Sequence, residues 1–207
     1  MRGLLITIVL VSIISLATYS VHAQQPKAKY TEKQIYEFFE QYSPRDVVEY
    51  VQAAVDHFAK IAHVAKNLPK EEEEKMFLEA LDSFNQKRLK FRWENFPFLP
   101  YVVPQRCDEG RVLAHPNPDF FPMMSKKGFL KRYKDMDGRK VGTELCERIR
   151  VTPEGAWTIQ YQWWPDTDKP LKMGLLFIQV PNTPYQIHSF FPTKTYTEGE
   201  LNQTLRQ

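Results

Sequence analysis

A proline-rich segment directly after a short apolar run constrains the fold of this chain most strongly. Residues 111–114 follow a turn at residues 107–110 and are predicted to form the second strand of a β-hairpin. The strand must end at His115, because prolines lack an amide donor and push the residue before them into extended geometry. The prolines that follow are Pro116, Pro118 and Pro122. We therefore expect a long loop across the end of the strand, where binding residues are common.

That loop ends in an acidic turn. Asp135 and Asp137 precede Gly138, so their carboxylates can accept hydrogen bonds from nearby backbone amides while the glycine takes a positive φ. The two aspartates are interpreted first as turn-forming residues. A contact between one of these carboxylates and a ligand is the alternative.

Helices are predicted for the first half of the chain. Thr31 and Ser43 have N-cap signals and begin helices over residues 31–41 and 43–68; the longer one carries an apolar stripe at steps of three and four residues. A third helix begins at Lys70. Its acidic residues 71–74 are expected to form a solvated first turn, where the helix dipole favours negative charge.

The second half of the chain is predicted to form an antiparallel sheet. Residues 101–103 pair with 111–114. A helix is predicted next, and after it three strands joined by short turns. These are the strands 156–164, 172–180 and 185–191 and the helix 142–149; residues 197–205 are expected to form a short terminal helix. The fold class is thus α+β, with about five central strands, the long helix on one face, and the loop and short helix of residues 115–145 over a pocket on the other.

The first 23 residues have the pattern of a signal peptide. Arg2 precedes an apolar run over residues 4–17, and short side chains occupy the expected cleavage positions. An exported protein, periplasmic or secreted, is predicted, or one anchored in a membrane by residues 4–20 if cleavage fails. The remaining residues, 24–207, are expected to form one domain, helical over about 31–90 and sheet-forming over about 98–195.

The charge balance argues against a nucleic-acid partner. The formal net charge is +3, and it falls to +2 when Arg2 is removed. The one basic cluster is interpreted as a solvated face, with attraction of small anions as the alternative. It consists of Lys126, Lys127, Lys131, Arg132, Lys134, Arg139 and Lys140.

Four features in this order resemble the type 2 single-Cache extracellular sensor domain. They are His115-Pro116-Asn117-Pro118 after an apolar strand, Asp135-x-Asp137-Gly138, the aromatic strand from Trp157 to Trp164, and Lys172. The resemblance covers roughly residues 75–195 and implies a PAS-like sheet that binds small molecules beneath loops and short helices. It also implies a stand-alone exported Cache domain.

The candidate ligand-binding residues come from this pattern and from side-chain chemistry. The resemblance implies that Lys172 lies beside the ligand, and the planar guanidinium of Arg92 would match a carboxylate. The full set is His115, Asn117, Asp135, Asp137, Tyr161, Trp163, Lys172 and Arg92.

Each candidate residue also has a structural alternative. Alternation places Trp157, Ile159, Tyr161 and Trp163 on one strand face, which is equally typical of plain core. His115 would fix the loop, Lys172 would lie at the surface, and residues 89–100, with Arg92, would be a packing loop. The family pattern has a glycine-rich last strand where this chain has His188-Ser189-Phe190-Phe191, and this bulk could narrow or close the pocket.

The function predicted from these features is binding without catalysis. No nucleophile or zinc-protease motif is present in the sequence, and neither a cofactor nor a metal is expected. The predicted role is an exported sensor for a short organic acid or amino acid. The alternative is an interaction module for a membrane receptor or kinase, with an aromatic patch over residues 93–98; a hydrolase using His115 is more distant. Cys107 and Cys146 form a disulfide or remain apart.

Overall fold

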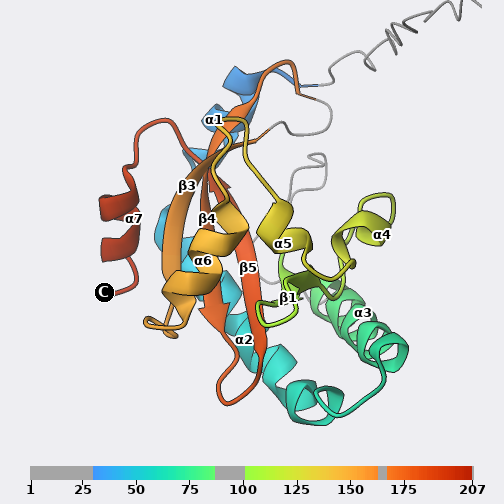
Figure 1. Cartoon of the computed structure of the whole chain (residues 1–207). Coiled ribbons are helices and arrows are strands. Elements are labelled where there is room, and N and C mark those ends of the chain that lie inside the picture. The colour runs from blue at the N-terminus through green and yellow to red at the C-terminus, as the bar shows by residue number, and fades with distance from the viewer. Residues whose placement is uncertain (1–29, 87–100, 163–166, 207) are drawn as a thin grey trace, which may run out of the picture.

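The computed structural model describes residues 30–86, 101–162 and 167–206 (Figure 1). Three predictions lie outside these residues, namely the signal peptide, Arg92 with its aromatic segment, and Trp163. Within the described residues, no helix has both the length and the apolar composition needed to cross a bilayer.

Three helices form the first part of the domain, as predicted. They are α1 (Glu32–Phe39), α2 (Pro44–Ala65) and α3 (Lys70–Gln86). The side chains of Thr31 and Ser43 accept hydrogen bonds from the amides of Gln34 and Asp46, and both N-termini are complete capping boxes. These local bonds fix where the first two helices begin.

Five antiparallel strands form one sheet in the order β2-β1-β5-β4-β3, which confirms the predicted α+β class. The edge strands are β2 and β3, and both come from the middle of the chain. The strands are β1 (Val103–Arg106), β2 (Arg111–Val112), β3 (Ala156–Gln162), β4 (Leu171–Gln179) and β5 (Tyr185–Pro192).

The first hairpin differs from its prediction. β1 begins two residues later than expected and contains Pro104, and β2 is only two residues long. The amide of Leu113 donates to the carbonyl of Pro104 at 2.9 Å, but proline has no N–H to donate in return. The ladder therefore ends at Val112.

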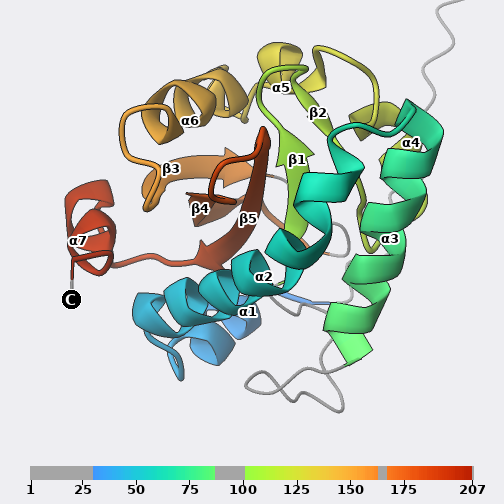
Figure 2. The same cartoon turned by 90° about the horizontal axis from the view of Figure 1, so that it is seen from below.

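Helices cover both faces of the sheet (Figures 1 and 2). α1, α2 and the terminal helix α7 (Glu198–Gln203) pack on one face, where Phe39 contacts Phe191 and Leu201 lies over Gly174. The other face is covered by α4 (Phe121–Met124), α5 (Phe129–Arg132) and α6 (Val141–Ile149). The crossing segment was predicted as a loop with one short helix, and the structure adds two helical turns to it.

A buried ion network joins α3 to the β1–β2 hairpin, contrary to the prediction of a solvated acidic turn. Glu73 is 1% exposed and Arg111 is 2% exposed, and the two side chains form an ion pair. Glu73 also accepts hydrogen bonds from Arg106 at 2.9 Å and from the hydroxyl of Tyr185 at 2.7 Å. Only Glu71 and Glu72 of the acidic run are exposed, because the inner face of the helix turns Glu73 toward the two arginines.

Cys107 and Cys146 form a disulfide that joins the hairpin turn to α6. This settles the alternative that the sequence left open. The bond fixes α6 over the face of the sheet that carries the pocket described next.

Candidate functional site

A small pocket lies between the sheet and the helices α4 to α6. Its volume is about 70 Å³, which corresponds to roughly five water-sized positions. All five strands and the crossing segment contribute to the wall. The lining residues are Tyr101, Gln105, Val112, His115, Met124, Phe129, Leu130, Tyr133, Gly142, Gln160, Gln162, Leu175, Phe177, His188 and Phe190.

Gln105 and His188 form a polar pair where β1 and β5 meet. Gln105 is fully buried, and its Oε1 accepts a hydrogen bond from Nδ1 of His188 at 2.9 Å. A carbonyl oxygen can only accept, so His188 carries its proton on Nδ1 in this geometry. Nε2 of Gln105 has no hydrogen-bond partner within the described residues. One donor is thus buried at the pocket without a partner.

Gln160 and Gln162 form a second polar pair on β3. Nε2 of Gln160 donates to Oε1 of Gln162 at 2.9 Å. Oε1 of Gln160 is buried and has no partner in the described chain. A buried amide atom without a partner costs about 1–3 kcal/mol, so a bound molecule that pairs with it would recover that free energy.

His115 is held in place by its own loop. Its Nδ1 accepts a hydrogen bond from the amide of Asn117 at 3.0 Å, and its Nε2 lies 3.2 Å from the hydroxyl of Tyr101. Nδ1 also lies 3.1 Å from the carbonyl oxygen of Asn117, so the ring proton is on Nε2 when Nδ1 accepts from the amide and on Nδ1 when it donates to the carbonyl. The loop-fixing role expected for His115 and a position in the pocket wall are therefore compatible.

The described wall of the pocket carries no permanent charge. None of its residues is Lys, Arg, Asp or Glu. Burial lowers the pKa of His115, and burial together with the nearby His115 lowers the pKa of His188 to about 3. Burial raises the pKa of Tyr101 and raises that of Tyr133 to about 12. At neutral pH these four side chains are uncharged.

The arrangement of sheet and crossing helices has counterparts among solved structures. One is the structure of a Cache chemosensory domain that describes carboxylic acid recognition; its TM-score is 0.52 at 14% identity, and the match covers 76% of this chain and 98% of that chain. The chain has the fold of a Cache domain. No protein-family model matches the sequence, and no curated protein matches it significantly.

Two other solved structures with similarity to this Cache fold come from chemotaxis proteins. A periplasmic sensor domain of a chemotaxis protein has a TM-score of 0.49 at 19% identity, with 73% of this chain and 93% of that chain covered. A methyl-accepting chemotaxis protein from Vibrio parahaemolyticus has a TM-score of 0.44 at 10% identity, with 66% and 80% covered.

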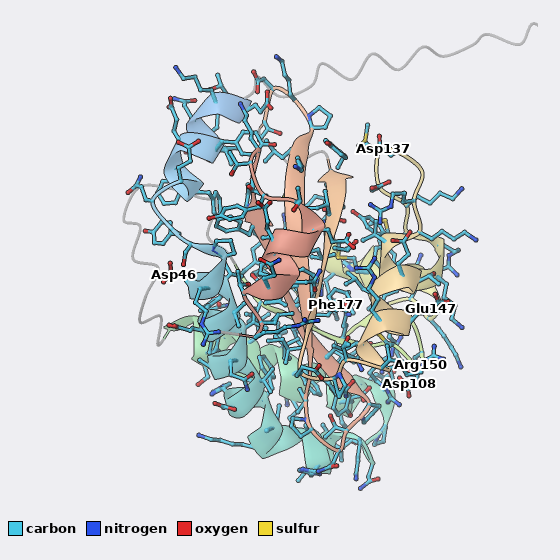
Figure 3. All side chains as sticks on the ribbon, turned by 90° about the vertical axis from the view of Figure 1, so that its left-hand side faces the viewer. Asp46, Asp108, Asp137, Glu147, Arg150 and Phe177 are labelled. Carbon is cyan, nitrogen blue, oxygen red and sulfur yellow. A yellow bond between two sulfur atoms is a disulfide. The ribbon has the colours of Figure 1, made fainter. Side chains whose placement is uncertain are left out.

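The aspartates predicted as site residues are turn residues in this Cache fold. Asp135 is buried, and its Oδ1 accepts hydrogen bonds from the amides of Asp137 and Arg139 at 3.0 and 2.9 Å. Its Oδ2 accepts one from the amide of Tyr161 at 3.4 Å. Asp137 is exposed at the outer end of the turn (Figure 3). Asn117 bonds the amide of Asp119 at 2.8 Å and lies behind His115 rather than in the wall.

Tyr161 and Lys172 lie opposite each other on β3 and β4, on the sheet face away from the pocket. The prediction that they approach His115 is therefore not met. Nζ of Lys172 donates to the backbone oxygens of Tyr196 and Lys194 at 3.1 and 3.4 Å. Its ammonium thus fixes the segment that leads to α7, which is a surface role of the kind considered as the alternative.

The pocket residues that sequence analysis missed follow from the same alternation that identified Trp157. Residues 158, 160 and 162 point to the face opposite Trp157 and Tyr161, and this places Gln160 and Gln162 in the Cache pocket. The aromatic stripe suggested the wrong face because both faces of the sheet are buried. Gln105 and His188 had no local signal, since they meet only when β1 pairs with β5.

Proposed function

We propose that this protein is an exported sensor domain that binds a short organic acid in the pocket between the sheet and α4 to α6. The observation that carries the proposal is the buried amide of Gln105, whose donor Nε2 has no hydrogen-bond partner within the described residues and can bind a carboxylate oxygen at the pocket. Such atoms are costly unless a ligand or water pairs with them. The solved Cache domain described as recognising carboxylic acids supports the ligand class.

The size of the pocket favours a small ligand. About 70 Å³ accommodates roughly four or five non-hydrogen atoms, as in acetate or propionate. Apolar side chains separate the two polar pairs, so the ligand is expected to bring an apolar portion next to its carboxylate. Leu175, Phe177 and Phe190 would contact that portion.

Catalysis is not part of this proposal. The described wall holds two histidines, His115 and His188, but no serine, cysteine, lysine or carboxylate side chain that could act as a nucleophile. Export is proposed from the predicted signal peptide over residues 1–23, and the disulfide is typical of an oxidising compartment. A membrane receptor or kinase is the proposed recipient of the signal.

A role as a protein-interaction module is the second candidate. Met136 and Tyr161 are 57% and 41% exposed and lie side by side, because the amide of Met136 donates to the carbonyl of Tyr161 at 2.9 Å. They form a small apolar patch next to the acidic turn. A partner that binds with or without ligand could contact this patch.

Thermal-shift screening against two- to four-carbon carboxylates and amino acids tests the proposed function. A ligand that binds only the folded state raises the melting temperature by mass action. Val112→Trp, which fills the pocket, should abolish the shift, whereas Lys172→Met should leave it intact. If no compound in the panel raises the melting temperature, the interaction module becomes the better account.

A further inference from the structure

A carboxylate in this pocket would meet no permanent cation among the described wall residues. The titratable groups that face the pocket, from the hairpin, the crossing segment and the central strands, are His115, His188, Tyr101 and Tyr133. Tyrosine can only lose a proton and would add negative charge. An isolated buried carboxylate is strongly unfavourable, so the ligand either binds as the neutral acid or meets one of the two imidazoles in its protonated form.

His188 is better placed for this than His115. Both ring nitrogens of His115 already have partners, namely the backbone of Asn117 and the hydroxyl of Tyr101. His188 uses only Nδ1, which donates to Gln105, and no hydrogen bond to its Nε2 is found in the described residues. Gln105, the partner of His188 in this bond, has an N–H group for which the described residues provide no acceptor. A protonated His188 and Gln105 would thus both present donors to an acceptor.

We propose that the pocket binds a carboxylate together with one proton from the solvent, which adds to Nε2 of His188. The Nε2–H of the imidazolium then donates to a carboxylate oxygen, while Nδ1–H keeps its bond to Gln105. The charges balance, because the carboxylate contributes one negative charge and the proton one positive charge. A second proton on His115 would repel the first, so the uptake is one proton for each ligand. This inference rests on the proposed function.

The low proton affinity of the empty pocket supports this coupling. His188 is neutral without ligand at any pH well above 3, so every bound carboxylate must bring its own proton. By linkage, the apparent affinity for the carboxylate then falls about tenfold for each unit by which the pH rises, up to the pKa that His188 has in the complex. A pocket with a fixed lysine or arginine would show no such dependence near neutral pH.

Calorimetric titration of the full chain with acetate and propionate between pH 5.5 and 7.5 tests the coupling. Repeating it in buffers of different ionisation enthalpy counts the protons, and about one per ligand is expected. His188→Gln should abolish proton uptake and weaken binding at pH 5.5 at least tenfold. His63→Gln removes an exposed histidine on α2 and should change neither quantity.

Nuclear magnetic resonance distinguishes a carboxylate on an imidazolium from a neutral acid on a neutral ring. With carboxyl-labelled propionate and ring-labelled histidine, we expect an ionised carboxylate and one protonated imidazole that is absent in His188→Gln. A protonated carboxyl group beside neutral rings would overturn the inference. The ionisation state of the bound carboxyl group is measured on the wild-type chain alone, so this part of the test stands even if the variant fails to fold.

The two proposals can fail separately. Carboxylate binding with no net proton uptake overturns the role of His188 and leaves the proposed function in place. No binding of acetate or propionate at either end of the pH range overturns both the proton coupling and the organic-acid ligand.

Discussion

The carboxylate of Glu198 in α7 accepts a hydrogen bond of 3.1 Å from the backbone amide of Ile159 in the edge strand β3. This bond is one of a row of hydrogen bonds that pairs the outer edge of β3. The outward-facing N–H and C=O groups of residues 157, 159 and 161 are all paired, although β3 is an edge strand of the sheet that the described residues form. The partners are Asn202 at 157, Glu198 and Arg139 at 159, and Asp135 with the amide of Met136 at 161. An open edge would invite pairing with another chain.

Glu198→Ala should therefore destabilise the protein and expose its edge. The amide of Ile159 loses its acceptor, and Arg148 loses a partner at 2.5 Å, so we expect a loss of about 2–3 kcal/mol in the free energy of unfolding. Urea denaturation measures that loss, and sedimentation should show self-association that rises with concentration. Glu147→Ala, on the exposed side of α6 (Figure 3), is the control and should do neither.

Arg111→Met should test the buried ion network. Removing one partner leaves Glu73 buried with fewer donors, and such changes typically cost about 3–5 kcal/mol. The exposed pair of Lys33 and Glu37, 3.4 Å apart, provides a contrast: Lys33→Met should cost less than about 1 kcal/mol. Equal losses from the two substitutions, measured by urea denaturation, would show that burial of the network contributes little.

Replacing Cys107 and Cys146 together by serine should destabilise the domain. The bond closes a segment with a sequence separation of 39 residues, for which the chain-entropy relation gives about 4 kcal/mol. Because α6 covers the pocket, ligand-induced thermal shifts should also shrink. Reductant should lower the melting temperature of the wild-type chain but not that of the double variant. A wild-type melting temperature that ignores reductant would contradict this.

Stability should fall on mild acidification because of His188. The unfolded chain binds this proton with the ordinary pKa of 6.5, whereas the folded chain binds it only near 3. Stability is therefore complete above pH 6.5 and declines by up to about 1.4 kcal/mol per pH unit as the pH falls toward 3. His188→Gln should flatten this decline in urea titrations between pH 7 and 4. An unchanged slope would mean that other groups dominate the acid sensitivity.

Glu198 contributes to acid sensitivity at lower pH. Burial alone would raise the pKa of this carboxyl, but hydrogen bonds from Arg148, Thr158 and the amide of Ile159 hold the pKa below its usual value. The stabilisation is present above the unfolded pKa of about 4.5 and is lost as the pH falls through the folded value. The loss of stability caused by His188 thus begins at a higher pH than the loss caused by Glu198. Urea titrations of His188→Gln and Glu198→Ala can therefore separate the two.

Local chemistry in the sequence determined much of the fold. The caps at Thr31 and Ser43 begin helices where predicted, and the order of helices before antiparallel strands defined the α+β class. The prolines after His115 forced the chain to cross the sheet. Each of these signals acts between residues close in sequence, so no knowledge of distant contacts was needed to interpret them.

Only the tertiary structure decided which face of the sheet holds the pocket and which side chains meet there. Alternation in β3 separates Trp157 from Gln160, but it does not tell which face α7 covers and which face α6 covers. The pair of Gln105 and His188 depends on strands that are 83 residues apart along the chain. Likewise, the buried position of Glu73 depends on arginines from the hairpin. Contacts over such separations are set by how whole elements pack, and a single sequence carries no local signal for them.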